Sequence, residues 1–237
     1  FNGMVMAQTG NRIAEQFGIT REEADLFAIE SHIRAHNAHK KGKFDDYHVA
    51  VKHDNGVLKT DEGIRPNSSL ESLSKLKPVF DENGIVTAGN ASQISDGAAA
   101  CLIMSREKAE ELELTPLATI TGYCATGVAP ADVMSAPIPT VQKLWKMNNR
   151  EGEKDYDLYE HNEAFASACL GVMEGLNLKH EKLNVNGGAV SMGHPLGASG
   201  CRIVLALIHA LRQNGGKRGF ATACLGGGMA TAIELEI

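Results

Sequence analysis

The sequence lacks long apolar runs, an excess of positive charge and a recognisable leader segment. Residues 98–104 form one of the longest apolar runs, whereas a membrane-spanning helix needs about 20 such residues. The net charge of -6 gives no general reason to expect nucleic-acid binding. No signal-peptide pattern opens the chain, but Phe1 is not an initiator methionine, so we expect a processed, truncated or partly represented chain. These absences favour a cytoplasmic protein (an organellar matrix protein if the source is eukaryotic) that has neither a membrane nor a nucleic acid as partner.

Cysteine is scarce and widely spaced. The five cysteines form no C-x-x-C pair; they are Cys101, Cys124, Cys169, Cys201 and Cys224. An odd count at wide spacing disfavours a disulfide framework and a structural zinc site. We therefore expect a reducing compartment and no metal site.

The N-terminal part opens with a helix signal and then becomes irregular. Thr20 and Glu23 form a capping box ahead of a predicted helix over residues 21–41. Its apolar positions recur at helical spacing, at Leu26, Ile29 and Ile33. Residues 43–95 are rich in turn formers, which indicates a loop-rich insertion with a few short strands.

Regular α/β alternation is predicted from residue 98 onward. We expect strands over residues 98–105 (buried), 117–125, 157–160, 219–224 and 229–237. Helices are predicted over residues 106–113, 140–148, 163–175 and 195–214. In the last strand the drier face should be formed by Met229, Thr231, Ile233, Leu235 and Ile237.

The glycine-rich run over residues 186–200 is the most informative segment. Pro195 suits the first position of a helix, where no N–H is needed. His194 would then lie at the positive end of that helix, which favours a neutral imidazole that donates a hydrogen bond. An isolated Gly-His-Pro is more often a structural loop with a capping histidine, but the full run is far more specific.

Two further segments carry potential chemistry. Cys224 precedes the turn Gly226-Gly227-Gly228, so a thiol could act as acid or base beside N–H groups that hold an oxyanion. A buried cysteine before a hairpin is the commoner alternative. Asn162 should cap the helix over 163–175 and could also hold a water. Glu163 would complement the helix dipole, and His161 is interpreted as structural.

Together these segments resemble thiolases, whose asparagine, Gly-His-Pro and Cys-x-Gly-Gly-Gly motifs occur in the same order. Four more segments match the family: Asp61-Glu62-Gly63-Ile64-Arg65-Pro66, Lys75-Leu76-Lys77-Pro78, Val86-Thr87-Ala88-Gly89-Asn90-Ala91-Ser92 and Asp96-Gly97-Ala98-Ala99-Ala100. The resemblance implies an α/β, thiolase-like layered αβαβα fold, here incomplete, with a loop-rich α+β insertion domain. Residues 1–94 would be the loop domain covering coenzyme A, 95–115 the last strand and helix of the N-terminal half, and 116–237 the C-terminal domain.

The resemblance also implies an acyltransferase activity: reversible Claisen condensation of acyl-CoA with acetyl-CoA, or thiolytic cleavage of a 3-ketoacyl-CoA. Cys224 matches the cysteine that removes the α-proton of acetyl-CoA. His194 and a water on Asn162 match the groups that stabilise the enolate oxygen, because a C–H this weakly acidic needs that stabilisation. The N–H of Gly226 matches part of a second oxyanion hole. Coenzyme A or acyl-CoA would be a substrate, with no permanently bound cofactor.

Further positions are assigned by the same resemblance. Arg65 and Ser72 match loop-domain residues near the nucleotide end of coenzyme A, and Ser92 matches a serine near the pantetheine amide. A solvated surface charge is an equally good reading of Arg65. Phe165 and Met134 match positions near the acyl pocket, although a core role is the stronger expectation for apolar side chains.

Two positions depart from the family pattern. No cysteine here matches the nucleophile that takes the acyl group, so we expect it on an N-terminal piece, in the same or a separate chain, without which turnover fails. Val5 stands where many biosynthetic thiolases have histidine. The expected assembly is a homo-oligomer or hetero-oligomer. The alternatives are a non-catalytic thiolase-like subunit for assembly or CoA binding, and a ketoacyl synthase, which lacks a Cys-x-Gly-Gly-Gly turn.

Overall fold

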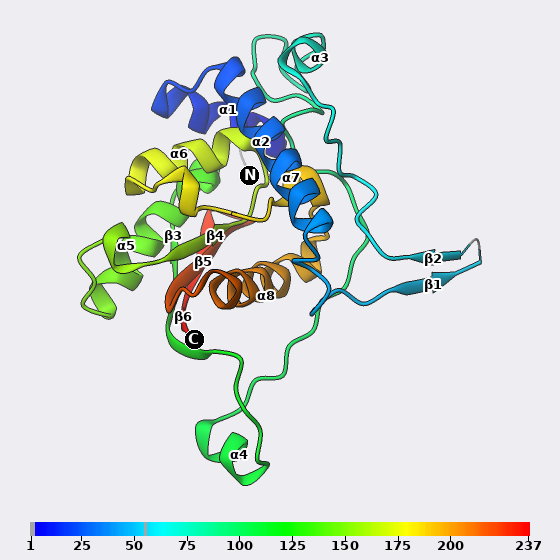
Figure 1. The fold of residues 1–237 in the computed structure, drawn as a ribbon. Helices are drawn as coiled ribbons and strands as arrows, with labels where there is room; N and C mark the ends of the chain where they lie inside the picture. Colours follow the sequence, from blue (N-terminus) through cyan, green and yellow to red (C-terminus); the bar gives the residue numbers. More distant parts are fainter. Residues whose placement is uncertain (1–2, 55) are drawn as a thin grey trace.

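A four-stranded sheet carries helices on both faces in the computed structural model, which describes residues 3–54 and 56–237 (Figure 1). The strand order is β3-β6-β5-β4. The pairs β3–β6 and β6–β5 are antiparallel, whereas β5 and β4 are parallel. The strands are β3 (Thr119–Gly127), β4 (Leu158–His161), β5 (Arg218–Leu225) and β6 (Met229–Glu236). Phe1 lies outside the described residues.

Alternating side chains of the strands enter two separate cores, because successive residues of a strand point to opposite faces. Tyr159 and Phe220 pack with residues of α5 (Pro137–Met147) and α6 (Ala166–Leu176). Their neighbours Leu158 and Ala221 pack with α8 (Leu196–Asn214) on the other face. The sheet is thus sandwiched between α5 with α6 and α8.

The remaining elements surround this layered body (Figure 1). Helices α1 (Met6–Phe17) and α2 (Arg21–Lys40) pack against α6, and α2 also packs against α7 (Ala189–Met192). The short elements of the loop-rich region are β1 (Val51–His53), β2 (Gly56–Leu58) and α3 (Leu70–Ser74), and α4 (Arg106–Glu111) follows that region. The 3-10 helices in the described part of the chain are η1 (Pro130–Ser135), η2 (Glu153–Asp155) and η3 (His180–Lys182). Among the described residues, no helix is both long and apolar enough to cross a membrane.

The capping box at the start of α2 is confirmed, but the predicted apolar face is wrong. Thr20 Oγ1 accepts a hydrogen bond from the Glu23 backbone N–H at 3.2 Å, and Glu23 Oε2 accepts one from the Thr20 N–H at 2.8 Å. Leu26 and Ile33 are exposed. Small side chains on the opposite face let α2 approach its neighbours, and the buried hydrophobic residues there are Ala24, Phe27, Ala28, Ala35 and Ala38.

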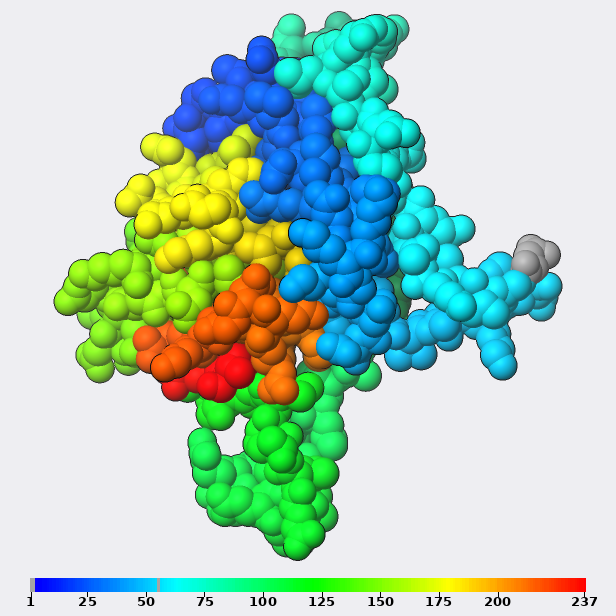
Figure 2. Space-filling view, in the orientation of Figure 1, coloured from blue at the N-terminus to red at the C-terminus, as the bar shows by residue number. Residues whose placement is uncertain are grey.

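The buried strand expected over residues 98–105 is absent. These residues form no strand, and Cys101, Leu102 and Ile103 are exposed. In Figure 2 this green segment stands off from the body of the molecule together with α4. No strand in the described part of the chain pairs with it, so its apolar side chains have no surface to pack on.

The dry face expected on the last strand is also wrong. Met229 is exposed, whereas Ala230, Ala232 and Glu234 are buried against the α5 side of the sheet. The opposite face of β3 and β6 is uncovered because α8 lies over β4 and β5. An apolar hollow of about 640 Å³ remains there, lined by Ile120, Tyr123, Ile203, Val204, Ala223 and Ile233 among others.

Most other element bounds agree with the predictions to within a few residues. The predicted helix over 140–148 begins earlier, at Pro137, which takes the first helical position. Helix α8 begins at Leu196, so Pro195 is its N-cap rather than its first residue. Differences of this size are usual at element ends.

Candidate active site

The carboxyl ends of β4 and β5 form the edge of the sheet on which the candidate site is built. The two strands are parallel, with His161 opposite Thr222. The Asn162 N–H continues this pairing by donating to the Thr222 carbonyl at 3.1 Å. Cys224 follows Thr222 by two residues and therefore lies on the same face of β5. Asn162 and Cys224 thus occupy neighbouring strand ends.

Asn162 does not cap a helix as the sequence suggested. Helix α6 starts at Ala166 with Phe165 at its N-cap, and no side chain caps it. The Asn162 amide nitrogen instead lies 3.3 Å from Nε2 of His194. The side chain is buried, and its oxygen has no hydrogen-bond partner among the described residues. A buried amide oxygen of this kind is suited to an additional donor such as a water.

His194 is held through its backbone and through its second ring nitrogen. Its N–H donates to the Gln93 carbonyl at 3.1 Å, and Nδ1 lies 2.6 Å from Ser199 Oγ. The Ser199 hydroxyl also lies 3.0 Å from the Pro195 carbonyl. Because that hydroxyl donates to the Pro195 carbonyl, it accepts from Nδ1–H of His194, and Nε2 accepts from the Asn162 amide nitrogen. Burial, and then the charge of Arg202, lowers the pKa of His194, so the imidazole is neutral at neutral pH.

The backbone before His194 requires glycine. Gly193 has φ +95, a conformation that L side chains rarely adopt. A Cβ added there would lie 1.9 Å from Ser95 Oγ. Gly193 therefore lets the Gly-His-Pro segment approach the segment of Gln93 and Ser95, which in turn fixes the position of the imidazole.

Cys224 borders an apolar cluster at the same sheet edge. Its Sγ lies 3.9 Å from Met134 Sδ, and both residues belong to one cluster with Phe165. Burial raises the pKa of the Cys224 thiol to about 11. The thiol is therefore protonated at neutral pH, and its thiolate, once formed, would be a strong base. The two predicted acyl-pocket residues, Met134 and Phe165, are brought together with this thiol.

The glycine turn after Cys224 is open at its first residue and tight at its last. Gly226 is exposed, and a Cβ added to it would meet no atom within 4 Å. Gly228 has φ +89, and its carbonyl accepts a hydrogen bond from the Val128 N–H at 2.7 Å. A Cβ on Gly228 would lie 2.5 Å from the Val128 carbonyl oxygen. The turn is thus fixed by Gly228 while Gly226 stays accessible.

Of the predicted coenzyme A residues, Ser92 lies next to the site. Its N–H donates to the Ala164 carbonyl at 3.0 Å, and the following residue, Gln93, holds His194. Arg65 is exposed, and its backbone N–H donates to His32 Nδ1 at 3.0 Å. The Ser72 hydroxyl donates to the Ser69 carbonyl at 2.8 Å within a capping box of α3. No hydrogen bond links Ser72 to the site in the described part of the chain, and its match to a residue near coenzyme A stays a prediction.

The side chain of Gln93 was missed by the sequence analysis and joins three segments. Its amide nitrogen lies 3.0 Å from the Gly63 carbonyl, 3.1 Å from that of Val190 and 3.0 Å from that of Ser191. This single side chain links the segment carrying Arg65 to the residues that precede His194. Gln93 directly follows the matched motif that ends at Ser92, and its position there was the only available signal.

Glu163 is buried rather than placed to complement a helix dipole. Its carboxylate accepts hydrogen bonds from Ser31 Oγ at 2.7 Å, Asn184 Nδ2 at 2.9 Å and the Val190 N–H at 3.1 Å. Burial raises the pKa of Glu163 despite these bonds. His161 is also buried, as expected for a structural residue, with Nδ1 lying 3.2 Å from the Thr222 carbonyl. The carboxylate thereby positions the chain leading to His194.

Comparison with known proteins places this arrangement in a family. The family model for the thiolase N-terminal domain matches residues 1–107, and that for the thiolase C-terminal domain matches residues 114–237. The chain therefore carries sequence from both domains. Because the N-terminal domain model matches residues 1–107, this comparison does not support the expectation that the piece carrying the nucleophile is missing.

Relatives and solved structures agree with the family models. An acetyl-CoA acetyltransferase of Chromobacterium violaceum is 45% identical over 241 residues, covering all of this chain and 61% of the relative. A probable acetyl-CoA acyltransferase of Staphylococcus aureus gives the same values. The Bacillus anthracis acetyl-CoA acetyltransferase structure matches with TM-score 0.93 and 42% identity over 98% of this chain and 60% of that one. Human mitochondrial 3-ketoacyl-CoA thiolase in complex with CoA matches with TM-score 0.92, 38% identity and coverages of 98% and 59%.

The chain spans about three fifths of the length of these relatives. Three observations agree on one family: the shared fold, the matches to both domain models, and the contact between the asparagine and histidine motifs at one sheet edge. This chain belongs to the thiolase family.

Proposed function

We propose that this chain supplies the enolate-forming part of a thiolase active site, which acts on acetyl-CoA during condensation or cleavage of a 3-ketoacyl-CoA. The observation that carries the proposal is the contact between Asn162 and His194 beside the strand end that bears Cys224. Cys224 would exchange the α-proton of the thioester. In the other tautomer of His194, Nδ1 would accept from the Ser199 hydroxyl and Nε2 would carry the proton. That Nε2–H and a water held by Asn162 would stabilise the enolate oxygen as charge develops.

The environment of each group supports this division of roles. A neutral imidazole can donate one hydrogen bond without placing a full positive charge in the pocket. A thiol whose pKa is raised to about 11 gives a thiolate basic enough to take a proton from a weak carbon acid. The Gly226 N–H would hold the oxyanion of the acyl-transfer step, and its open surroundings leave room for a thioester oxygen.

We also propose that the acyl-accepting cysteine is contributed from outside these 237 residues. Cys101 is exposed on a segment without secondary structure, and Cys169 is fully buried with its pKa raised well above normal. Cys124 lies on β3, and its thiol donates to the Thr140 carbonyl of α5. A buried, protonated thiol cannot serve as a nucleophile, and a distant one cannot reach the thioester. Burial, and then a hydrogen bond with Cys101, raises the pKa of Cys201 to about 11, so this thiol is also protonated at neutral pH. Cys224 remains, and the proposal reserves it for proton transfer.

The partner arrangement is part of the same proposal. Residues 1–94 would cover coenzyme A, with Arg65 near its nucleotide end and Ser92 near its pantetheine arm. Residues 95–115 would complete the N-terminal half, and residues 116–237 would form the C-terminal domain. The uncovered apolar face of β3 and β6 and the exposed residues Leu102 and Ile103 favour an assembly with further thiolase sequence, in this or another chain. A non-catalytic subunit for assembly or CoA binding is the alternative.

Exchange of the methyl protons of acetyl-CoA with deuterated water tests the enolate step without needing the acyl-accepting cysteine. The 237-residue chain and its assembly with a cysteine-bearing N-terminal segment would be followed by ¹H NMR. We expect exchange to fall at least about 100-fold in His194→Ala and Cys224→Ala. Cys124→Ser is the matched control and should exchange normally. Exchange that persists in both site variants would refute the proposal.

The oxyanion role of Gly226 has its own test in the assembled enzyme. Gly226→Ala keeps the backbone N–H and meets no neighbour, so thiolysis of acetoacetyl-CoA should be nearly unchanged. Gly226→Pro removes the N–H and should lower kcat about 100-fold or more. Equal activity of the two variants would exclude the N–H from the reaction. CoA binding without turnover by the wild-type assembly would favour the non-catalytic alternative.

A further inference from the structure

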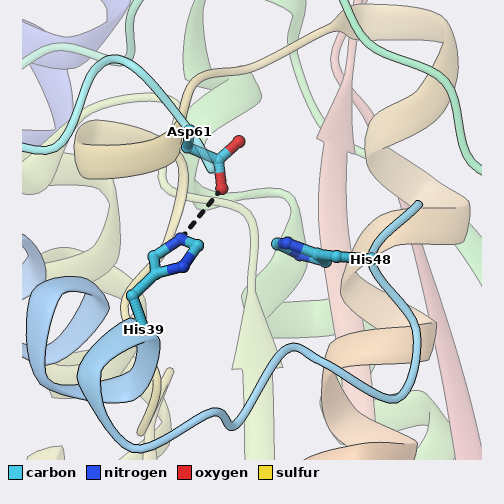
Figure 3. Close-up of side chains that lie close together, drawn as sticks. All are labelled: His39, His48 and Asp61. Atoms are coloured by element: carbon cyan, nitrogen blue, oxygen red, sulfur yellow. Dashed lines mark ion pairs between the residues drawn. The ribbon is translucent and has the colours of Figure 1, made fainter. Parts of the chain in front are cut away.

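Two histidines and an aspartate meet outside the candidate active site. His39 lies in the last turn of α2, His48 in the loop that follows, and Asp61 in the segment after β2 (Figure 3). One ligand atom from each lies within 4.8 Å of the others. All three residues are partly buried, and Figure 3 shows their side chains directed toward one another.

The His39–Asp61 contact has the spacing of metal ligands rather than of a hydrogen bond. His39 Nε2 is buried and makes no hydrogen bond to any described residue, although Asp61 Oδ2 lies 3.5 Å away. Two ligands held 2.0–2.2 Å from a tetrahedral zinc ion are themselves about 3.3–3.5 Å apart. The two groups lie at ion-pair distance, and the buried imidazole nitrogen, which has no hydrogen bond to a described residue, is available as a metal ligand.

Aromatic neighbours hold the two imidazoles at the site. The ring of His48 stacks on Phe44 with centroids 4.6 Å apart and planes at 7°. His39 contacts the same ring at 4.5 Å, and Tyr47 contacts His48 at 5.0 Å.

The charged groups around the cluster have opposite effects on a bound cation. Asp61 and Asp45 act on His48 as negative charges, and Arg202 acts on it as a positive charge. Nε and Nη2 of Arg202 are buried without partners among the described residues. Arg202 therefore opposes a cation, whereas the two carboxylates attract one. To bind a tetrahedral metal ion, the ligand atom of His48 must also move closer to those of His39 and Asp61 by up to about 1.4 Å.

We propose that His39, His48 and Asp61 bind a divalent transition-metal ion of the zinc class, with water completing the coordination. Two imidazoles and one carboxylate are the donor set that suits zinc, cobalt or iron(II) rather than magnesium or calcium. The ion would fasten the segment carrying Asp61 to the end of α2. That segment leads to Gly63, whose carbonyl bonds Gln93, so the site acts as a structural clip. The proposal is independent of the proposed function.

Titration of the 237-residue chain with Co²⁺, followed by visible absorption, tests the site directly. We expect one equivalent to bind with weak d–d bands and without sulfur-to-cobalt charge transfer, and Zn²⁺ to displace it. His39→Gln, His48→Gln and Asp61→Asn should each weaken binding about tenfold or more. His36→Gln, a histidine of the same helix outside the cluster, is the control and should bind normally.

A second readout covers variants that fold poorly. Zn²⁺ should raise the melting temperature of the wild type and of His36→Gln, but not that of His39→Gln, and Mg²⁺ should raise none of them. An intense charge-transfer band would assign binding to the cysteines and overturn the proposal. Equal Co²⁺ affinity in His48→Gln, or no binding to the wild type, would overturn it as well.

Discussion

Glu234 provides a sharp stability prediction, because its carboxylate is fully buried in β6 and bonded on several sides. Arg150 Nη2 lies 2.7 Å and Thr121 Oγ1 2.8 Å from its Oε1, while Tyr156 OH lies 2.5 Å from its Oε2. Burial alone would raise the pKa of Glu234. Hydrogen bonds from Arg150, Tyr156 and Thr121 outweigh burial and lower the pKa to about 2.

The lowered pKa converts to a free energy of unfolding that depends on pH. A shift from 4.5 to about 2 is about 2.5 pKa units, which corresponds to about 3.4 kcal/mol at pH 7. Because the folded pKa is depressed, this contribution is present above pH 4.5 and is lost as the pH falls toward 2. The same relation leaves about 1.4 kcal/mol at pH 3.

Glu234→Gln should therefore destabilise the chain by about 3 kcal/mol at pH 7 and by less than half of that at pH 3. Urea unfolding followed by circular dichroism at the two pH values measures both differences. Glu236→Gln is the matched control: this residue on the same strand is partly exposed and bonds Arg218, so its loss should cost about 1 kcal/mol or less. A cost for Glu234→Gln that does not change between the two pH values would refute the reasoning.

Two further predictions concern glycine and cysteine. Gly193→Ala should destabilise the chain by about 1–3 kcal/mol, because Gly193 has a positive φ and an added Cβ would clash with Ser95 Oγ. Gly197→Ala is the control and should not destabilise the chain, because an added Cβ there meets no neighbour. Urea unfolding measures both costs, and equal costs would contradict the conformational argument. Exposed Cys101 should react with a thiol reagent in the native state, whereas buried Cys169 should react only when the chain unfolds. Mass spectrometry after timed alkylation gives the order of labelling, and faster labelling of Cys169 would contradict its burial.

Local signals explain the parts of the fold that the sequence predicted correctly. The capping box of Thr20 and Glu23 fixes the start of α2, and both partners lie within one turn of each other. The glycine turn after Cys224 has a local component as well, because Gly227 and Gly228 both adopt positive φ. Such features need no knowledge of the rest of the chain, so the sequence alone is sufficient to find them.

The errors arise where distant parts of the chain decide the outcome. Residues 98–105 have the composition of a buried strand, yet a strand needs a partner strand and a surface to cover it. The last strand buries Ala230 and Ala232 because α5 covers that face, and no alternation of residue types reveals which face will be covered. Asn162 looked like a cap because helix α6 begins later than its pattern suggests.

The candidate site was predicted in part. The motifs identified His194, Asn162 and Cys224, but not the side chains that hold them. Gln93 and Ser199 act through contacts with backbone and ring atoms from other segments, and such contacts leave no periodic trace in sequence. The His39, His48 and Asp61 cluster was missed for the same reason, because its members are spaced irregularly along the chain.

The exposed segment around residues 98–105 has a consequence for the thermodynamics of the whole chain. The accessible surface is 12561 Å² at a mass of 25.3 kDa, whereas a compact monomer of that mass exposes about 10,300 Å². The difference of about 2,200 Å², which belongs to the whole chain, exceeds the area of about 800 Å² that one partner contributes to a standard protein–protein interface. Folding of the chain and binding of a partner to this surface are therefore linked equilibria. The measured free energy of unfolding should rise with the concentration of the partner that covers the surface.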